Sequence, residues 1–435
     1  MVPLLAVAMT LAVMNTTMFN LALPSISREF GLSSGSTSWI VTGYSIVFAI
    51  ASIAYSRLSD VVPIRRLLLI GLLSLGIAAL AGLFSNSFVA LLLARLVQAS
   101  GAGSVPALSL VLISRYVAAE RRGRATAVTM SAVSLALGLG PVLGGALVEY
   151  FGWHSLFVVT AAALLLVPLF AVVVPQERPA AGSFDALGAL LIGLGTTGLL
   201  LAITNRSWPA LAAGAVALAL FTVRIRRARE PFVQPELFGN RTYLLLVAVG
   251  IGAYMCSFAT LFLMPQMLVN LFGLTVMESG LVIFPGSLLA MLVSRVVGRI
   301  IDSRGNAGIL RYVPPFVLLA TVLFALFLGL SYMAVLLIYM ILSVGFTFLT
   351  SSISNEISRL LPGSRIGSGL GLYQLLQFFS GAFSVALAAS ALSWQKSLPL
   401  GDAYANLYWG LSGIALLSIA ASLFYLRTRR VRQPA

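Results

Sequence analysis

The chain has 435 residues, of which 60% are hydrophobic and only 9% are charged. A soluble globular domain carries about 25% charged residues, so this composition excludes a cytosolic enzyme, a secreted disulfide scaffold and a disordered protein. Cys256 is the single cysteine, which excludes a disulfide within the chain and a multi-cysteine metal site. The composition predicts an all-α integral membrane protein.

Long apolar runs, separated by polar or Gly/Pro-rich breaks, predict fourteen membrane-spanning segments. The runs are predicted to be helical, because lipid cannot satisfy free backbone groups and no alternating barrel pattern is present. The chain opens on apolar residues without a basic region before them, so we expect a span there and not a removable signal peptide. The predicted spans are 3–24, 37–56, 67–85, 88–112, 125–148, 155–174, 186–204, 208–223, 243–264, 279–297, 312–330, 333–353, 369–392 and 406–426.

The net charge of +15 would suit a nucleic-acid partner, but the positions of the 27 basic residues favour a membrane protein. Lys and Arg collect in the cytoplasmic loops of such proteins. With the N-terminus inside, 23 of the 27 lie on cytoplasmic connections or span ends. Arg28, Arg206 and Lys396 fall outside, and Arg95 falls within a span. We therefore expect both termini in the cytoplasm and no nucleic-acid partner.

Two cytoplasmic connections predict an internal repeat. The chain reads Ser-Arg-Leu-Ser-Asp over 56–60 and Gly-Arg-Ile-Ile-Asp over 298–302, and further arginines follow each run. Matching elements in the two parts of a transporter indicate related halves; the alternative is that both are ordinary basic turns. The predicted division is 1–175 for a six-helix half, 176–242 for two linker helices with a basic loop, and 243–435 for a second six-helix half with a short basic tail.

Arg95 is the one charged residue that lies away from the ends of a predicted span, and it forms an Arg-x-x-Gln motif with Gln98. A buried arginine costs ~2.5–3.5 kcal/mol on insertion scales, so we expect it to face polar partners or a water-filled cavity. The alternative is an arginine that snorkels to the outer surface.

The runs at 15–17 (Asn-Thr-Thr) and 20–24 (Asn-Leu-Ala-Leu-Pro), the loop at 56–66 and the Arg-x-x-Gln motif resemble the major facilitator superfamily. The similarity is greatest to its 14-helix drug:proton antiporter branch, and within it to Gram-positive tetracycline and multidrug efflux proteins. The fifth span resembles the antiporter motif of exporting members, although its small residues also suit an ordinary packing seam. The motif residues are Gly140, Pro141, Gly144 and Gly145.

This resemblance implies a major facilitator fold, alternating access between the two halves, and export driven by proton antiport. It also implies a cytoplasmic gate, because charged residues at helix ends can make bonds that break when the halves rock. The gate residues would be Asp60, Arg65 and Arg66, with Asp302 and Arg304 in the second half.

A proton-coupled carrier needs a titratable group whose access changes between states. The similar tetracycline exporters have membrane-embedded glutamates where this chain has Thr16, Leu137 and Gly381, and none of the twelve acids falls near the middle of a span. One cluster at the outer side remains a candidate proton site, although its histidine also suits a plain interfacial role. Its members are Glu149, Glu29 and His154.

Neutral polar side chains in the spans are the further candidates for the transport path, as substrate contacts or as bonds between helices. They are Gln98, Asn15, Asn20, Tyr44, Tyr254, Gln374 and Gln377. Because Arg95 is the sole charge among them, the path favours a neutral, zwitterionic or anionic amphiphile over a cation.

The sequence therefore predicts a secondary exporter of small organic molecules that acts as a monomer in a bacterial plasma membrane, with no cofactor, metal or catalytic residue. The expected partners are the substrate, protons and the lipid bilayer. Arginine outnumbers lysine 26 to 1, which favours a GC-rich bacterial source. The alternatives are an uncoupled facilitator and a transport-inactive sensor of the same fold. A membrane enzyme is disfavoured, because the chain lacks a nucleophile–His–acid set and a metal cluster.

Overall fold

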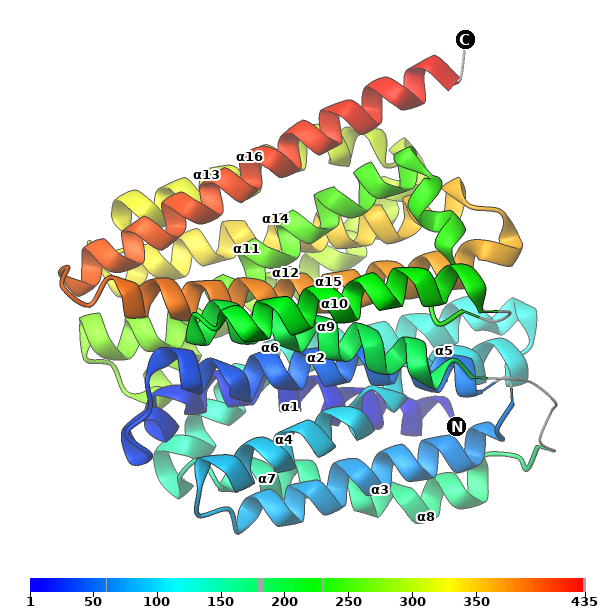
Figure 1. Cartoon of the computed structure of the whole chain (residues 1–435), viewed down its shortest axis with the longest axis horizontal. Helices are drawn as coiled ribbons and strands as arrows, with labels where there is room; N and C mark the ends of the chain where they lie inside the picture. Colours follow the sequence, from blue (N-terminus) through cyan, green and yellow to red (C-terminus); the bar gives the residue numbers. More distant parts are fainter. Residues whose placement is uncertain (60, 178–183, 229–230, 433–435) are drawn as a thin grey trace. The chain divides into compact units, whose positions relative to one another are not determined.

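The computed structural model describes residues 1–59, 61–177, 184–228 and 231–432, and every regular element in these ranges is a helix (Figure 1). The chain divides into two compact units, Met1–Phe232 and Val233–Ala435. The first unit contains α1 (Val2–Glu29), α2 (Ser34–Leu58), α3 (Ile64–Leu83), α4 (Phe88–Ala102), α5 (Ser104–Tyr116), α6 (Ala119–Phe151), α7 (Ser155–Ala161), α8 (Ala163–Val173), α9 (Ala186–Asn205) and α10 (Trp208–Arg227).

The second unit begins with a short 3-10 helix and continues with six long helices. They are η1 (Pro235–Gly239), α11 (Arg241–Phe272), α12 (Val276–Arg304), α13 (Ala307–Phe327), α14 (Tyr332–Leu360), α15 (Gly363–Trp394) and α16 (Leu400–Arg432). Thirteen segments of the described chain are long and apolar enough to cross a membrane, and α6 supplies the fourteenth with its 33 residues. The predicted fourteen-helix membrane fold is therefore confirmed. The three-part division at residues 175 and 242 stays a prediction.

The fourth predicted span, 88–112, consists of two helices, α4 and α5, that meet at Gly103. Pro106 has no backbone N–H and cannot donate to the carbonyl of Ala102, so regular helix hydrogen bonding is interrupted here. A Cβ atom on Gly103 would lie 2.7 Å from the carbonyl oxygen of Phe48 on α2. The glycine thus allows α2 to pack directly against the backbone at the junction.

The two helices α9 and α10 belong to the first unit by their contacts. The indole Nε1 of Trp39 on α2 donates a hydrogen bond of 3.3 Å to the hydroxyl of Thr204 on α9. A Cβ atom on Gly198 of α9 would lie 2.6 Å from the Cα atom of Gly214 on α10, so the two backbones are in direct contact. Close glycine contacts of this kind are how membrane helices associate without a hydrophobic driving force.

Asp185 holds together the chain segments around α9 and α10. Its carboxylate caps α9 by accepting from the backbone N–H of Gly188 at 3.0 Å, and it pairs with Arg224 near the end of α10 at 2.9 Å. It also accepts from the backbone N–H of Phe232 at 3.2 Å. Burial would raise the pKa of this carboxyl, but these bonds outweigh burial and lower its pKa.

We predict opposite effects for two Gly→Ala substitutions within membrane helices. Gly198→Ala places a methyl group against the backbone of Gly214 and should destabilise the first unit by about 1–3 kcal/mol, as overpacking does. Gly413→Ala on α16 meets no atom within 4 Å and should be neutral or stabilising by about 1 kcal/mol through helix propensity. Thermal unfolding of the purified variants in detergent measures both. Equal shifts would show that α9 and α10 are not closely packed.

Candidate functional site

Arg95 lies in the middle of α4 and is only 1% exposed, so its side chain does not reach the outer surface. Its guanidinium Nη1 donates hydrogen bonds to Oδ1 of Asn15 on α1, at 2.5 Å, and to Oε1 of Gln98 one turn along α4, at 3.0 Å. Asn15 and Gln98 are both fully buried. The Arg-x-x-Gln spacing explains the second bond, because residues three apart face the same side of a helix.

Two aromatic rings hold the guanidinium from the neighbouring helices. The Cζ atom of Arg95 lies 3.8 Å from the ring centroid of Phe19 on α1 and 4.1 Å from that of Tyr44 on α2. Cation–π contacts contribute about 2 kcal/mol or more when the cation is desolvated. Phe19 packs edge-on against Phe157 of α7, with ring centroids 5.0 Å apart, and this contact orients its ring.

Within the described part of the chain, no carboxylate pairs with Arg95. Three atoms of this group have no hydrogen-bond partner among the described residues, namely Nε of Arg95, Nδ2 of Asn15 and Nε2 of Gln98; Oδ1 of Asn20, further along α1, has none either. Buried polar groups are almost always hydrogen-bonded, so these atoms indicate a place for water or a ligand. Three of the four are donors, which suits a ligand rich in acceptor oxygens.

The glycines of the antiporter motif pack α6 against α1 beside this cluster. A Cβ atom on Gly140 would overlap Oγ1 of Thr17, and one on Gly144 would lie 2.9 Å from the Cα atom of Met18. The motif proline, Pro141, is buried within α6. A larger residue at either glycine would push α6 away from the segment of α1 that carries Asn15. Close packing is therefore one function of these residues.

Gln374 and Gln377 lie on α15 in the second unit, where Gln377 is 6% exposed and Gln374 is half-buried. Tyr254 of α11 belongs to an aromatic cluster in the same unit. Its ring stacks on Phe258 at a centroid distance of 5.2 Å and meets Phe346 of α14 edge-on at 5.0 Å. This cluster offers flat apolar surfaces, in contrast to the polar groups around Arg95.

The residues of the outer candidate proton site make contacts with other groups. Glu29 accepts a 2.6 Å hydrogen bond from the indole of Trp153, whose ring stacks on the imidazole of His154 at 3.6 Å. Nε2 of His154 lies 3.1 Å from the carbonyl oxygen of Ser85. Glu149 is exposed near the end of α6. Trp153 thus connects Glu29 and His154, which sequence analysis did not anticipate.

Of the predicted gate residues, Asp60 lies outside the described residues, as does the side chain of Asp302. Arg65 is half-buried, while Arg66 and Arg304 are exposed. The loop between α2 and α3 is instead anchored by groups that sequence analysis assigned no role. Glu177, just after α8, accepts from the backbone N–H of Ile64 at 2.9 Å.

Two side chains at the end of α5 complete this anchor. The Tyr116 hydroxyl donates to Glu177 at 2.5 Å, and Arg115 pairs with the same carboxylate at 3.3 Å. Arg115 also donates to the carbonyl oxygen of Ser59 at 3.0 Å. Burial would raise the pKa of Glu177, but the bonds from Ile64, Tyr116 and Arg115 hold it below its ordinary 4.5. Burial and the bond to Glu177 raise the pKa of Tyr116 to about 12.

The second unit anchors its equivalent loop in a related way. Asn306, directly after the second arginine-rich run, donates to Glu356 of α14 at 2.6 Å and to Asn355 at 2.8 Å. Tyr425 of α16 donates to the same glutamate at 2.7 Å. In each unit, a glutamate that follows the loop in the chain accepts hydrogen bonds from the loop and from a tyrosine hydroxyl. In the sequence, both glutamates lie three residues after a predicted span, 155–174 and 333–353, but their partners come from distant helices.

A comparison with protein families identifies the family of this chain. A model of the Major Facilitator Superfamily matches residues 5–385. The chain belongs to this superfamily. It is a multi-pass membrane transporter, and the expected family is confirmed.

Relatives and solved structures extend the comparison. The chain is 26% identical over 98% of its length, and 96% of the relative's, to the riboflavin transporter RibZ of Clostridioides difficile. It is 31% identical over 66% of its length, and 56% of the relative's, to the multidrug resistance protein Stp of Mycobacterium tuberculosis. The fold matches the human organic anion transporter MFSD10, with a TM-score of 0.68, 18% identity and coverage of 97% and 98% of the two chains.

We predict that Glu177→Gln weakens the anchor of the α2–α3 loop. The substitution removes a charge that accepts three side-chain or backbone bonds, and at this partly exposed position it should cost about 1 kcal/mol at pH 7. Because the native pKa is lowered, the stabilisation is present at neutral pH and is lost only as pH falls below the ordinary value of 4.5.

The measurement is thermal unfolding of wild type and variant in detergent between pH 7.5 and 4. Asp402→Asn, at an exposed acid at the start of α16, serves as the control. The gap between wild type and Glu177→Gln should stay constant down to about pH 5 and then narrow. A gap that widens on acidification would contradict the anchoring role.

Proposed function

We propose that the protein is a secondary exporter of small organic molecules that works by alternating access between two six-helix halves. The observation that carries the proposal is the fully buried Arg95, which has neutral hydrogen-bond partners and unsatisfied donors around it. An intramembrane ionisable residue of this kind is by default a candidate for the substrate or ion pathway. The protein would act in a bacterial plasma membrane, with both termini in the cytoplasm.

The substrate class follows from the chemistry around Arg95. A permanent cation and surplus N–H donors favour carboxylates, carbonyl oxygens and other acceptors, and they disfavour cationic drugs. Similarity to a protein named as a riboflavin transporter supports including riboflavin among the compounds tested, since its ring carries carbonyl acceptors. Export is supported by the resemblance of Gly140 to Gly145 to the antiporter motif and by similarity to a multidrug resistance protein.

Proton antiport is part of the proposal, with the outer group of Glu29, Glu149 and His154 as the coupling site. Its support is the proximity of His154 and Glu29 through Trp153, at the end of α6 that carries the antiporter motif. Imidazole and carboxylate groups are the side chains that relay protons in membrane carriers.

An uncoupled facilitator is the second candidate, and one specific observation favours it. The partner of Arg95 on α1 is the amide of Asn15, where the wider antiporter branch often has an aspartate. A neutral partner cannot exchange a proton with the solvent. A transport-inactive sensor with the same fold would show no substrate movement in any test.

We predict uphill export from proteoliposomes when a pH gradient is imposed. A panel of riboflavin, anionic dyes and cationic dyes is loaded, and efflux is followed with and without the gradient. His154→Gln and Glu149→Gln should retain downhill movement but lose the response to the gradient, whereas Asp402→Asn, an exposed acid at the start of α16, should retain both. Downhill movement alone in the wild type would establish the facilitator.

We also predict that charge at the Arg95 cluster sets selectivity. Arg95→Ala should lower transport of anionic and carbonyl-rich compounds by about 10- to 100-fold, the size expected for loss of a charge-assisted bond. Asn15→Asp should neutralise Arg95 and shift preference from anionic toward cationic members of the panel. Asn240→Asp is a matched control, because aspartate can replace asparagine as the cap of α11. Unchanged selectivity in Asn15→Asp would remove Arg95 from the substrate path.

A further inference from the structure

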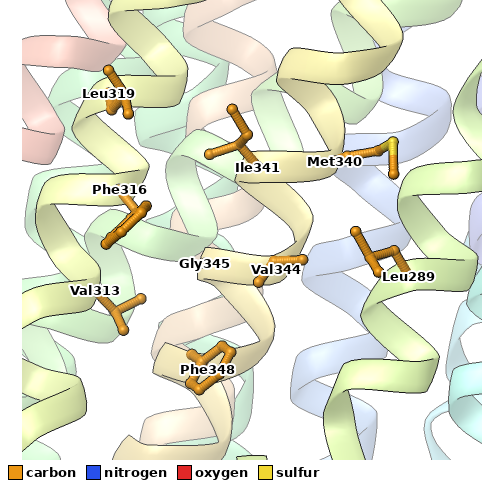
Figure 2. A pocket seen from close by; sticks show the side chains of 9 residues that line it. All are labelled: Leu289, Val313, Phe316, Leu319, Met340, Ile341, Val344, Gly345 and Phe348. Atoms are coloured by element: carbon orange, nitrogen blue, oxygen red, sulfur yellow. The ribbon is translucent and has the colours of Figure 1, made fainter.

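An apolar groove opens on the second unit between α12, α13 and α14 (Figure 2). Its volume of about 430 Å³ lies within the range of ligand sites. The lining is almost wholly apolar, so the groove holds no polar group that could orient a polar substrate. The lining residues are Leu289, Val313, Phe316, Leu319, Met340, Ile341, Val344, Gly345 and Phe348.

The groove is elongated along the helices. On α13 its lining residues recur every three positions from Val313 to Leu319, and on α14 they follow one face from Met340 to Phe348 (Figure 2). At 1.5 Å per residue these stripes are ~9 Å and ~12 Å long. Because spanning helices run across the bilayer, the long direction of the groove follows that of lipid acyl chains.

Two features shape the groove, namely an exposed rim and a glycine in its floor. Phe316 and Leu319 on its rim are 54% and 46% exposed. Gly345 forms part of its floor, where a Cβ atom would lie 3.2 Å from Cγ2 of Val317 on α13. The missing side chain lets α13 and α14 approach at this level, and the larger side chains on either side form the walls.

The helix ends nearest one end of the groove carry positive charge. Arg311 lies two residues before Val313, with its guanidinium 5.4 Å from the ring centroid of Tyr312, and both residues are exposed. Arg304 at the end of α12 and Arg359 near the end of α14 are also exposed, and Arg359 Nη1 lies 4.0 Å from the Cβ position of Gly305. The described acid at this end, Glu356, is 3% exposed and bonded to Asn306 and Tyr425.

We propose that this groove binds one acyl chain of an anionic phospholipid, whose phosphate lies at the arginine-bearing end beside Arg311. Apolar lining and elongated shape suit the chain, and the exposed arginines suit the headgroup. Basic residues at the cytoplasmic ends of membrane helices attract anionic lipids, and the basic residues of this chain predict that this end is cytoplasmic. The lipid would bridge α12, α13 and α14 of the second unit.

The test uses the purified full-length protein in detergent with phosphatidylglycerol, and in parallel with phosphatidylethanolamine of the same acyl chains. Native mass spectrometry counts the lipids retained per protein and yields their affinities. We expect one retained phosphatidylglycerol. Arg311→Gln should weaken it about fivefold, the effect of one arginine near a membrane surface, and should weaken phosphatidylethanolamine less, because the ammonium group of that lipid offsets its phosphate charge.

Leu319→Trp narrows the groove and should weaken both lipids by about tenfold or more through lost chain burial. Leu326 lies two turns further along α13, is 58% exposed and does not line the groove. The Leu326→Trp variant should therefore bind both lipids as the wild type does. Arg241→Gln, an exposed arginine at the start of α11, is the control for charge. Equal losses in Leu319→Trp and Leu326→Trp, or an unchanged lipid preference in Arg311→Gln, would overturn the proposal. Displacement of the lipid by a transported compound would identify the groove as a substrate site instead.

Discussion

A guanidinium buried in a membrane protein has to be stabilised by the protein itself, because lipid offers neither hydrogen bonds nor counter-charge. Arg95 meets this constraint without an acid among the described residues. The side-chain oxygens of Asn15 and Gln98 accept hydrogen bonds from its guanidinium, and the rings of Phe19 and Tyr44 lie against the cation. These groups come from α1, α2 and α4, so a single side chain imposes a requirement on how three helices of the first unit pack.

The same requirement explains the small residues nearby. Asn15 can reach Arg95 only if α1 is correctly placed, and α1 is held closely by α6 through Gly140 and Gly144. The glycines thus have a mechanical connection to the arginine, whatever further part they have in transport. A bundle of this kind brings helices together by close backbone contact and interhelical hydrogen bonds, since lipid tails are as apolar as leucine.

Each unit also anchors the loop that carries its arginine-rich run. Glu177 binds the loop of the first unit with Arg115 and Tyr116, and Glu356 binds that of the second with Asn306 and Tyr425. The chemical roles are similar although the residues come from different positions. Charge-assisted bonds of this kind are among the stronger hydrogen bonds in proteins, which suits a group that holds a loop in place.

The sequence by itself determined the membrane class, the fourteen helices and the family, because apolar run length, basic-residue placement and local motifs are read along the chain. It also singled out Arg95, Gln98, Asn15 and Tyr44, which the structure brings together. Only the tertiary structure decided which neutral groups satisfy Arg95, that Trp153 joins Glu29 to His154, and that Glu177 binds the α2–α3 loop. Those contacts join residues up to 124 positions apart, so they depend on helix packing, which no local pattern specifies.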